Sequence, residues 1–488
     1  MPVQPTYPGV YVQEVPSGVR TITGVSTSVA VFIGRAKRGP VDKPVLCLNF
    51  SDFERTFSSD TSKGDLPRSV RLFFQNGGTQ CFVLRIAPDA MAASALVQNE
   101  DNDGNSFKAT AISPGIDGDK IELFVEHDVD APNDTFNLEI MFDGEPVEKW
   151  TWISMAPNSS KYLPKYVNSG LVVFSDFGEK RPADTTTFLE NGVEDIPPRL
   201  VDFLDMAFPI IDRNIDLFNL MVLPKDAGYS HETALWAAAS DLCLKRRAFL
   251  LIDSPENWKT KEDALSEINS LRSGLVKDHS ALFFPHVMVR ENGMNIPVGP
   301  AGAIAGLISR IDANRGVWKA PAGTEADIRG INGLSYRFSD EENGVLNPRG
   351  INTIRIFPNG IVNWGARTMD GDDNFASEWK YIPVRRTALF IEESLYRGLK
   401  WVVFEPNDEP LWAQIRLNVG AFMHNLFRQG AFQGQTKREA YFVKCDKETT
   451  TQNDINLGIV NIWVGFAPLK PAEFVILSLQ QMAGQIQV

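Results

Sequence analysis

Cysteine and histidine are scarce in this sequence of 488 residues, which has four cysteines and five histidines. The cysteines are far apart and none belongs to a Cys-x-x-Cys pair, while no two histidines have the spacing of metal ligands. Each cysteine lies in or beside an apolar run, as buried free thiols of a reducing compartment do. We therefore expect neither a metal site nor a disulfide framework.

Long apolar runs and an excess of basic residues are also missing. No apolar run approaches the roughly 18 residues that a membrane-spanning helix needs. The opening MPVQPTYPGV lacks the charged start and the apolar core of a secretory signal. The formal net charge is −13, and an acidic chain is poorly suited to bind phosphate backbones. We expect a chain that is assembled in the cytoplasm, without membrane insertion and without nucleic acid as a partner.

Signatures of catalysis and of cofactor binding are missing as well. The glycine-rich stretch 299–306, GPAGAIAG, matches neither phosphate-loop pattern and is better explained as a closely packed helix start. The acidic stretches 101–105 and 370–374 lack the glycine and the closing glutamate of a calcium loop. No Gly-x-Ser-x-Gly elbow and no catalytic cysteine signature are present. The sequence predicts no catalytic residue, no cofactor and no metal. A cytoplasmic α/β enzyme whose active site is assembled from distant segments is the alternative.

The patterns that are present predict a multidomain chain of mixed α+β and α/β class. Residues 1–20 contain four prolines, which exclude a helix, and the alternation over 9–15 predicts one short strand without a nearby partner. Strands and helices alternate in 21–90 and again in 201–344, which indicates one discontinuous α/β domain. Between them, 91–200 has short strands separated by Asp, Asn and Gly turns. We expect a β-rich insertion on the outer surface there.

The last third, 345–488, is expected to be α+β. Residues 390–404 and 411–430 have helical periodicity, and one apolar face of the second helix comprises Leu411, Ile415, Val419, Phe422 and Leu426. Strands are expected in AYFVKCD, in GIVNIWVGFAP and in AEFVILSLQQ, the last of which stands near the end of the sequence.

Two stretches combine many special residues with no reactive constellation, which favours a surface that holds other proteins. They are LNPRGINTIRIFPNGIVNWGARTM (346–369) and EWKYIPVRRTALFIEESLYRGLKWVVFEPND (378–408). Both closely resemble the C-terminal part of contractile tail sheath proteins, the subunits of phage tails, R-type bacteriocins and extracellular contractile injection systems. Further segments resemble the family in the same order: YPGVYVQEV (7–15), TSVAVFIGRAKRGP (27–40), FFQNGGTQCFVLRI (73–86), RGVWKAPAG (315–323), VKCDKETTTQNDINLG (443–458) and PAEFVI (471–476). The segment SPGIDGD (113–119) departs from the family, which more often has Gly-Asn after an aromatic residue.

The resemblance implies a structural subunit and not an enzyme. Such subunits form six-fold rings that stack helically around an inner tube, and the sheath contracts to drive the tube through a target envelope. The implied partners are further copies of the chain, the tube protein, baseplate proteins, terminator or cap proteins and, in some particles, a paralogous sheath protein. The particle would assemble in the bacterial cytoplasm as a phage tail or a phage tail-like particle, the latter released extracellularly. The arm and residues 345–488 would form the inner sheath domain.

The resemblance and the unpaired terminal strands together predict sites of assembly. We expect arms at both chain ends to add strands to a sheet of neighbouring subunits, through Val10, Tyr11, Val12, Phe442, Val443, Phe474, Val475 and Ile476. Charged contacts between subunits are expected at Arg355, Arg367, Arg385, Arg386 and Glu405, with an intrachain ion pair as the other reading of Arg385 and Arg386. Tube-facing positions are expected at Arg416, Lys437 and Arg438. A shell or scaffold protein that never contracts is a third hypothesis.

Overall fold

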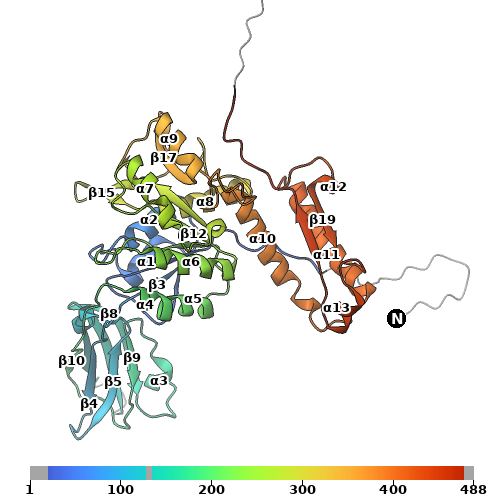
Figure 1. Ribbon diagram of the computed structural model, residues 1–488. Coiled ribbons are helices and arrows are strands. Elements are labelled where there is room, and N and C mark those ends of the chain that lie inside the picture. The colour runs from blue at the N-terminus through green and yellow to red at the C-terminus, as the bar shows by residue number, and fades with distance from the viewer. Residues whose placement is uncertain (1–19, 128–133, 477–488) are drawn as a thin grey trace, which may run out of the picture. The chain divides into compact units, whose positions relative to one another are not determined.

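The computed structural model describes residues 20–127 and 134–476 and divides the chain into two compact units. The first unit holds 27–314 and 321–382, and the second holds 1–26, 315–320 and 383–488. Figure 1 shows the first unit in blue to light orange and most of the second in orange to red.

An eight-stranded sheet organises the first unit, in the order β18-β17-β13-β12-β11-β1-β3-β2. The six inner strands are parallel and the two edge strands are antiparallel to their neighbours. Apart from β17, which contains Asn352, Thr353 and Arg355, the inner strands are almost continuously apolar and buried, as parallel strands covered on both faces are. The strands are β1 (Ala30–Gly34), β2 (Val45–Cys47), β3 (Cys81–Arg85), β11 (Leu220–Val222), β12 (Phe249–Asp253), β13 (Ser280–Phe284), β17 (Ile351–Phe357) and β18 (Gly360–Asn363).

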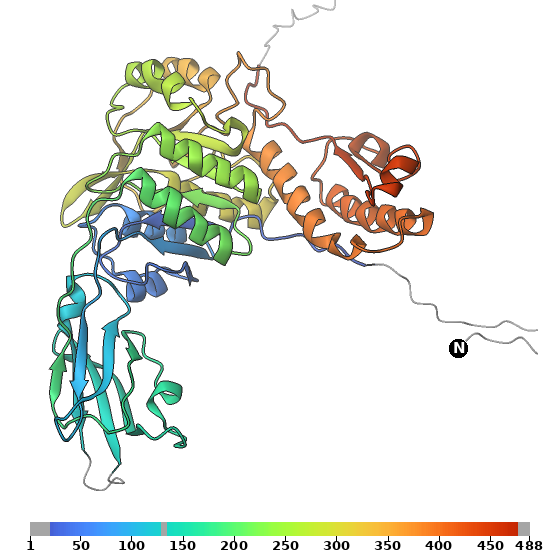
Figure 2. The ribbon, with the colours of Figure 1, turned by 60° about the horizontal axis from the view of Figure 1, so that its bottom comes forward.

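Helices cover both faces of this sheet (Figure 2). On one face, α5 (Phe208–Asn214), α6 (Thr233–Arg246) and α7 (Lys261–Leu271) share a core with Val31 and Ile33 of β1. On the other face α2 (Leu66–Gln75) brings Phe73 against Phe32, with ring centroids 5.5 Å apart. Alternate side chains of β1 therefore pack against helices on opposite faces of the sheet, which confirms the α/β layer that the sequence predicts.

The glycine-rich stretch starts helix α8 (Ala301–Arg315), which packs closely on α2. A Cβ on Gly302 would lie 2.5 Å from the carbonyl oxygen of Ser69, and one on Gly306 would lie 2.1 Å from that of Phe73. Both distances are too short for any side chain, so glycine is required there. The reading of this stretch as a packed helix start is confirmed.

Two antiparallel sheets form the insertion expected over 91–200. One has the order β4-β5-β9 and the other β10-β6-β7-β8, and their inner faces share one apolar core. The strands are β4 (Ser94–Gln98), β5 (Asn105–Ala111), β6 (Ile121–Glu126), β7 (Thr135–Phe142), β8 (Glu145–Ser154), β9 (Val172–Ser175) and β10 (Thr186–Phe188).

Shorter elements complete the first unit. They are α1 (Phe50–Phe57), η1 (Ile116–Lys120), α3 (Leu163–Tyr166), α4 (Leu200–Asp202), η2 (Phe203–Ala207), η3 (Lys277–His279), β14 (Val287–Glu291), β15 (Met294–Val298), β16 (Gly333–Leu334), α9 (Asp340–Leu346) and η4 (Asn347–Arg349).

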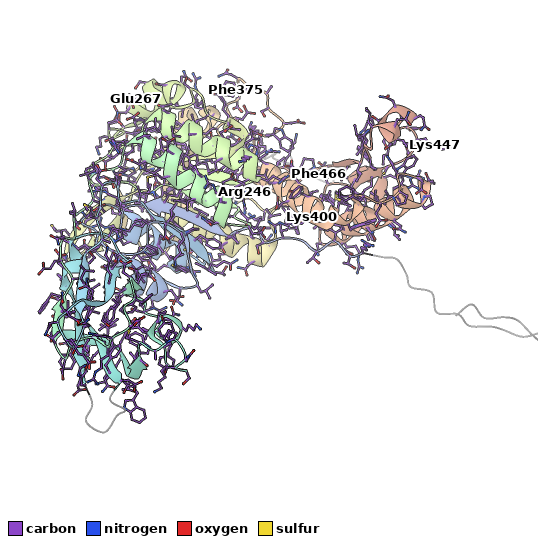
Figure 3. All side chains as sticks on the ribbon, turned by 90° about the horizontal axis from the view of Figure 1, so that it is seen from below. Arg246, Glu267, Phe375, Lys400, Lys447 and Phe466 are labelled. Atoms are coloured by element: carbon purple, nitrogen blue, oxygen red, sulfur yellow. The ribbon has the colours of Figure 1, made fainter. Side chains whose placement is uncertain are left out.

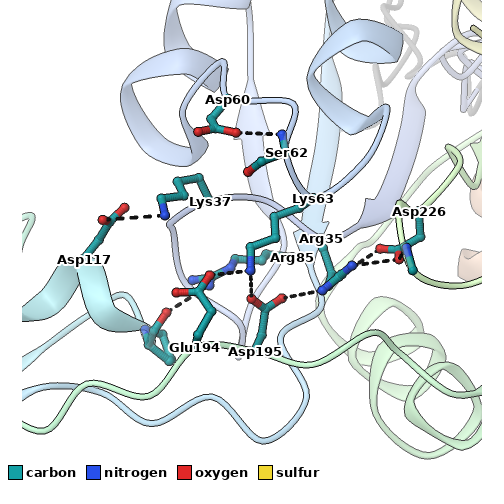
Figure 4. A network of polar contacts seen from close by, with 12 residues as sticks. Arg35, Lys37, Asp60, Ser62, Lys63, Arg85, Asp117, Glu194, Asp195 and Asp226 are labelled. Carbon is teal, nitrogen blue, oxygen red and sulfur yellow. Dashed lines mark hydrogen bonds and ion pairs between the residues drawn. The ribbon is translucent and has the colours of Figure 1, made fainter.

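A network of ion pairs ties the exit of the insertion to the large sheet (Figure 4). Arg35, just after β1, donates to both oxygens of Asp226 at 2.7 and 2.9 Å, and its guanidinium lies 3.7 Å from Asp195. Lys63 donates to Asp195 at 2.8 Å and also pairs with Glu194. Burial alone would lower the pKa of Lys63, but the two carboxylates outweigh it and raise that pKa above its ordinary value.

The segment that departs from the family pattern lies at this same junction. Arg85, the last residue of β3, is fully buried and donates to the hydroxyl of Ser113 at 3.0 Å and to the carbonyl of Pro114 at 2.9 Å. Buried donors need such acceptors, so the unusual sequence at Ser113 still anchors the insertion.

The second unit is built on two long helices and a two-stranded sheet. Helix α11 begins after Asp408, whose side chain accepts from the N–H of Leu411 at 3.3 Å. Its five expected apolar residues are all buried, so the predicted face of α11 is confirmed. The elements are α10 (Ile382–Gly398), η5 (Lys400–Val402), α11 (Glu409–Arg428), α12 (Lys437–Ala440), β19 (Tyr441–Lys444), α13 (Gln452–Asn456) and β20 (Trp463–Phe466).

The structure differs from the sequence-based expectations at four places. Residues 21–26 and 315–320, expected in the α/β domain, lie with the second unit. Residues 345–382 lie with the first unit, because β17 pairs in parallel with β13, so the boundary falls near 383 instead of 345. The helix expected over 390–404 begins earlier, at Ile382, and ends at Gly398. The strand expected from Ala472 is not formed within the chain over 472–476, and the rest of that segment lies outside the described residues.

Candidate assembly surface

The two strands of the second unit form a sheet that is open on both sides. β19 and β20 pair antiparallel, from Tyr441 opposite Phe466 to Lys444 opposite Trp463. Over 20–127 and 134–476, no further strand joins either one, so each has an edge of unpaired backbone groups. Two-stranded sheets are marginal alone and readily accept added strands.

The two faces of this sheet differ. Val443 and Val464 pack against the core of the unit, together with Phe466, which Figure 3 labels. On the opposite face, Phe442 and Trp463 are more than half exposed. Phe442 and Val443, two of the residues expected to take part in strand exchange, therefore lie in an open sheet with an apolar outer face.

The C-terminal segment exposes three consecutive apolar residues. Phe474, Val475 and Ile476 are 74%, 81% and 88% exposed. Contiguous exposed apolar side chains on a soluble chain mark contact sites for other proteins. The other expected exchange residues, Val10, Tyr11 and Val12, lie outside the described residues.

The base of the N-terminal arm is fixed to the second unit. The backbone N–H of Arg20 donates to Asn418 Oδ1 at 3.1 Å, and its guanidinium carbon lies 4.5 Å from the centroid of the Trp401 ring. Ile22 is buried in the same core as α11. The arm thus starts from the unit that carries the open sheet.

The charged residues expected to form contacts between subunits differ in how exposed their side chains are and in whether they are paired within the chain. Arg355 pairs with Asp340 at 2.6 Å, and Glu405 is exposed. Arg385 and Arg386 are buried in α10, and Arg385 lies 3.4 Å from Glu392, in agreement with an intrachain ion pair. Because the side chain of Arg355 is only 12% exposed, Glu405 is the more accessible of these residues to a neighbour.

Arg367 is buried completely, which argues against the expected contact with a neighbour. Its guanidinium donates to the carbonyl of Gly371 at 3.1 Å and to Asp373 at 2.9 Å. The backbone N–H of Arg367 donates to Asn352 Oδ1 at 2.7 Å. A side chain enclosed by its own unit is not accessible to a second chain, so we assign Arg367 to the fold and no longer to the surface.

This assignment makes a stability prediction. Arg367→Ala leaves a cavity and unpaired buried acceptors, and we expect it to lower the free energy of unfolding by about 3 kcal/mol. The matched control is Arg349→Ala, since the side chain of Arg349 is 43% exposed and lies 3.8 Å from the carboxylate of Asp372, so the loss there is below about 1 kcal/mol. Urea unfolding of both variants measures the difference. Equal losses would contradict a structural role for Arg367.

The residues expected to face the tube are partly engaged within the chain. Arg416 pairs with Glu409 at 2.6 Å and donates to the carbonyl of Cys445. Lys437 and Arg438 are exposed at the start of α12, directly before β19. The two latter side chains are the more available to a partner.

Sequence reasoning missed exposed aromatic residues of this unit, among them Trp463 and Phe404. Trp463 belongs to the outer face of the open sheet. Because successive residues of a strand point to opposite faces, the position of Trp463 next to Val464, which packs against the core, could have indicated that the Trp463 side chain is exposed. Phe404 is fully exposed with a φ of 70°, where a bulky residue is strained. Pro406 argues against a helix through this segment and could have indicated the loop that presents Phe404.

Neither a metal cluster nor a membrane-spanning helix is found in the described part of the chain. No group of three or more His, Cys, Asp or Glu side chains is placed to hold a metal ion there. No helix among those residues combines the length and the apolar character needed to cross a membrane.

Comparison with known proteins agrees with this picture of an assembling chain. The family model of the phage tail sheath protein central domain matches residues 216–369, and that of the phage tail sheath C-terminal domain matches 376–482. The tail sheath protein of Vibrio phage KVP40 is 28% identical over 247 residues, which is 49% of this chain and 35% of that protein. That of Burkholderia phage BcepMu is 29% identical over 173 residues, 32% of this chain and 34% of that protein. The matched segments thus span about a third of these curated relatives.

Solved structures match over almost the whole chain. The helical sheath of the anti-feeding prophage in its contracted state has a TM-score of 0.61 at 26% identity, covering 98% of this chain and 99% of that one. The sheath tail protein of Listeria innocua has a TM-score of 0.64 at 13% identity, covering 92% and 96%, and shows a shared fold. Since the two family models together span more than half of the sequence, this chain belongs to the phage tail sheath protein family.

Proposed function

We propose that this chain is the structural subunit of a contractile sheath, which polymerises as stacked hexameric rings around an inner tube and contracts to drive that tube through a target envelope. The observation that carries the proposal is the open sheet of β19 and β20 in a unit that also exposes an apolar C-terminal segment. Arms from neighbouring copies would complete this sheet. The printed description of the anti-feeding prophage relative, a helical sheath in a contracted state, supports the same function.

Strand addition supplies enough free energy to hold subunits together. An added strand as long as the one predicted over 9–15 would form about four to six backbone hydrogen bonds, each with a net contribution of about 0.5–1.5 kcal/mol. Burial of apolar arm side chains adds to that sum. One arm thus contributes a few kcal/mol, and each subunit can both give and receive arms, so copies stay linked while they rotate and slide.

Contraction then needs no chemical fuel within this chain. An extended lattice that is less stable than the contracted one by a few kcal/mol per subunit stores the work during assembly, and many subunits release it together. The exposed residues Glu405, Lys437 and Arg438 are our candidates for contacts that change between the two lattices or meet the tube, together with Arg355, whose side chain is 12% exposed. Baseplate and cap proteins would nucleate and end the lattice.

We further propose that the particle is of the extracellular injection type. The support is that the solved sheath of an extracellular contractile injection system covers 98% of this chain at 22% identity, and that of the anti-feeding prophage covers 98% at 26% identity. Particles purified from the producing bacterium are expected to lack a DNA-filled head in electron micrographs. Assembly in the cytoplasm and release from the cell would follow.

Electron microscopy of the purified chain, alone and with its tube protein, tests the sheath function. We expect tubes with six-fold symmetry and two lattices of different length. A small closed oligomer would favour an enzyme with an α/β core. Tubes that keep one length after treatment with mild denaturant would favour a scaffold that never contracts.

Charge reversal at Glu405 should change the lattice without changing the subunit. Glu405 is exposed, so Glu405→Lys is expected to alter the free energy of unfolding by less than about 0.5 kcal/mol. The extended sheath should become rarer, because a repulsive contact repeats in every subunit. The control Glu405→Gln removes the charge without reversing it and should have a smaller effect. Sheath lengths measured in micrographs test whether the effect of Glu405→Lys exceeds that of Glu405→Gln. Identical lengths for the parent chain and both variants would show that Glu405 makes no such contact.

A further inference from the structure

A cavity of about 740 Å³ opens in the first unit. Its lining comes from the segments that follow β11, β12 and β13, with Gly299 at the start of α8. The carboxyl ends of parallel strands meet there, which is where α/β sheets of this kind bind ligands.

The cavity lies beside the point where the order of strands reverses, between β1 and β11. The chain runs from β1 to β3 on one side and then returns to β11 on the other. At that reversal, the guanidinium of Arg35 fills the space next to Asp226. Asp226 itself lines the cavity, so a cation of the chain already pairs with this carboxylate.

One carboxylate in the cavity has no cationic partner. Asp253 ends β12, and its Oδ1 accepts from the N–H of Ala301 at 2.7 Å. No ion pair of Asp253 is formed within the described residues, whereas the two other carboxylates of the lining are paired, Asp226 with Arg35 and Glu256 with Lys225. The lining therefore has one carboxylate whose charge, when it is ionised, no cation of the described residues neutralises.

The surroundings of Asp253 make that charge costly. Burial raises the pKa of Asp253 to about 7, and the negative charge of Asp65 acts in the same direction. The histidines of the lining do not compensate it, because burial lowers the pKa of His231 to about 4 and also lowers that of His286. A cation in the cavity would remove this cost by pairing with the ionised carboxylate.

Aromatic rings stand in the same lining. The ring centroids of Tyr229 and His231 are 5.9 Å apart, and those of His231 and Trp236 are 4.9 Å apart. Faces of such rings attract organic cations, and an aromatic wall beside a carboxylate is the usual chemistry of ammonium recognition. Anionic ligands are disfavoured by the same carboxylates.

We propose that this cavity binds a small organic cation, an alkylammonium or guanidinium group, which pairs with the carboxylate of Asp253 and lies against the rings of Tyr229 and His231. The group comes either from a free amine or from a basic side chain of another copy of this chain. The proposal does not depend on the sheath function, since binding is measured on the isolated full-length chain.

Calorimetric titration with putrescine and with agmatine tests the binding, and 1,4-butanediol serves as a neutral probe of the same length as putrescine. We expect saturable binding of at least one cation and none of the diol. Asp253→Asn keeps an acceptor for the N–H of Ala301 and should weaken binding at least tenfold. The control Asp42→Asn changes an exposed carboxylate outside the cavity and should leave affinity unchanged.

A second variant distinguishes a loss of the binding site from misfolding of Asp253→Asn. Ala227→Phe fills the cavity from an exposed position on its rim and should abolish binding while Asp253 is intact. The melting temperature of ligand-free Asp253→Asn should equal or exceed that of the parent chain, because a buried uncompensated charge is gone. Absence of saturable binding of both cations, or an affinity of Asp253→Asn or Ala227→Phe equal to that of the parent chain, would overturn the proposal.

Assembly separates the two sources of the cation. If a neighbouring copy supplies it, Asp253→Asn lowers the yield of tubes and putrescine competes with polymerisation of the parent chain. If a free amine supplies it, tubes form equally well from both proteins. Either result, given saturable binding, supports the cation site.

Discussion

Deletion of residues 1–19 is expected to abolish sheath tubes while leaving a folded, soluble subunit. The arm in the proposed assembly adds its strand to a neighbour's open sheet, so its loss removes a few kcal/mol from every link of the lattice. Polymerisation repeats this loss at each subunit, and a tenfold weakening already needs only about 1.4 kcal/mol per contact. We therefore expect tube yield to fall by far more than tenfold.

The point of truncation matters, because the residues that follow belong to the fold. Arg20 contacts Asn418 and Trp401, and Ile22 is buried beside α11. Deletion of 1–19 keeps these contacts and should leave the melting temperature unchanged, whereas Ile22→Ala should cost about 2–4 kcal/mol of stability. Negative-stain micrographs and melting curves of the two proteins separate assembly from folding. Intact cylinders from the truncated chain would contradict strand exchange through this arm.

The elements with strong local patterns are the ones that the sequence predicts well. The continuous apolar run of β12 predicts a strand that is buried on both faces, and the helical spacing of apolar residues in α11 predicts a helix that is buried along one side. Neither prediction requires knowledge of the neighbouring elements. The same holds for the insertion, since alternation and turn residues set its strands. The terminal apolar segment at Phe474 is likewise visible as a pattern, although its partner is not.

Features that depend on distant partners were not predictable. Ile351 to Phe357 could belong to either unit until its pairing with β13 is known, and that choice moved the boundary by almost forty residues. Arg367 has a surface-like identity but is enclosed by Gly371 and Asp373. The cavity at Asp253 is made by loops that follow three separate strands, and only the strand order brings them together.

Val475→Pro is expected to prevent tube formation, whereas Val475→Thr is expected to permit it. Proline lacks the backbone N–H and fixes φ, so it interrupts any sheet that the C-terminal segment joins. Threonine is β-branched like valine and keeps the propensity for a strand. Because Val475 is 81% exposed in the single chain, neither change should shift the free energy of unfolding by more than about 0.5 kcal/mol.

The pair of variants distinguishes strand pairing from simple apolar contact. If the exposed segment merely packs its side chains on a neighbour, the polar hydroxyl of threonine should weaken assembly at least as much as proline does. If the segment pairs through its backbone, only proline removes a hydrogen bond and the assembly yield of the threonine variant stays within a few fold of the parent chain. Sedimentation of tubes at several protein concentrations gives the critical concentration of each variant. Equal critical concentrations for proline and threonine would exclude backbone pairing at Val475, and with it the part of the proposed lattice that depends on the C-terminal segment.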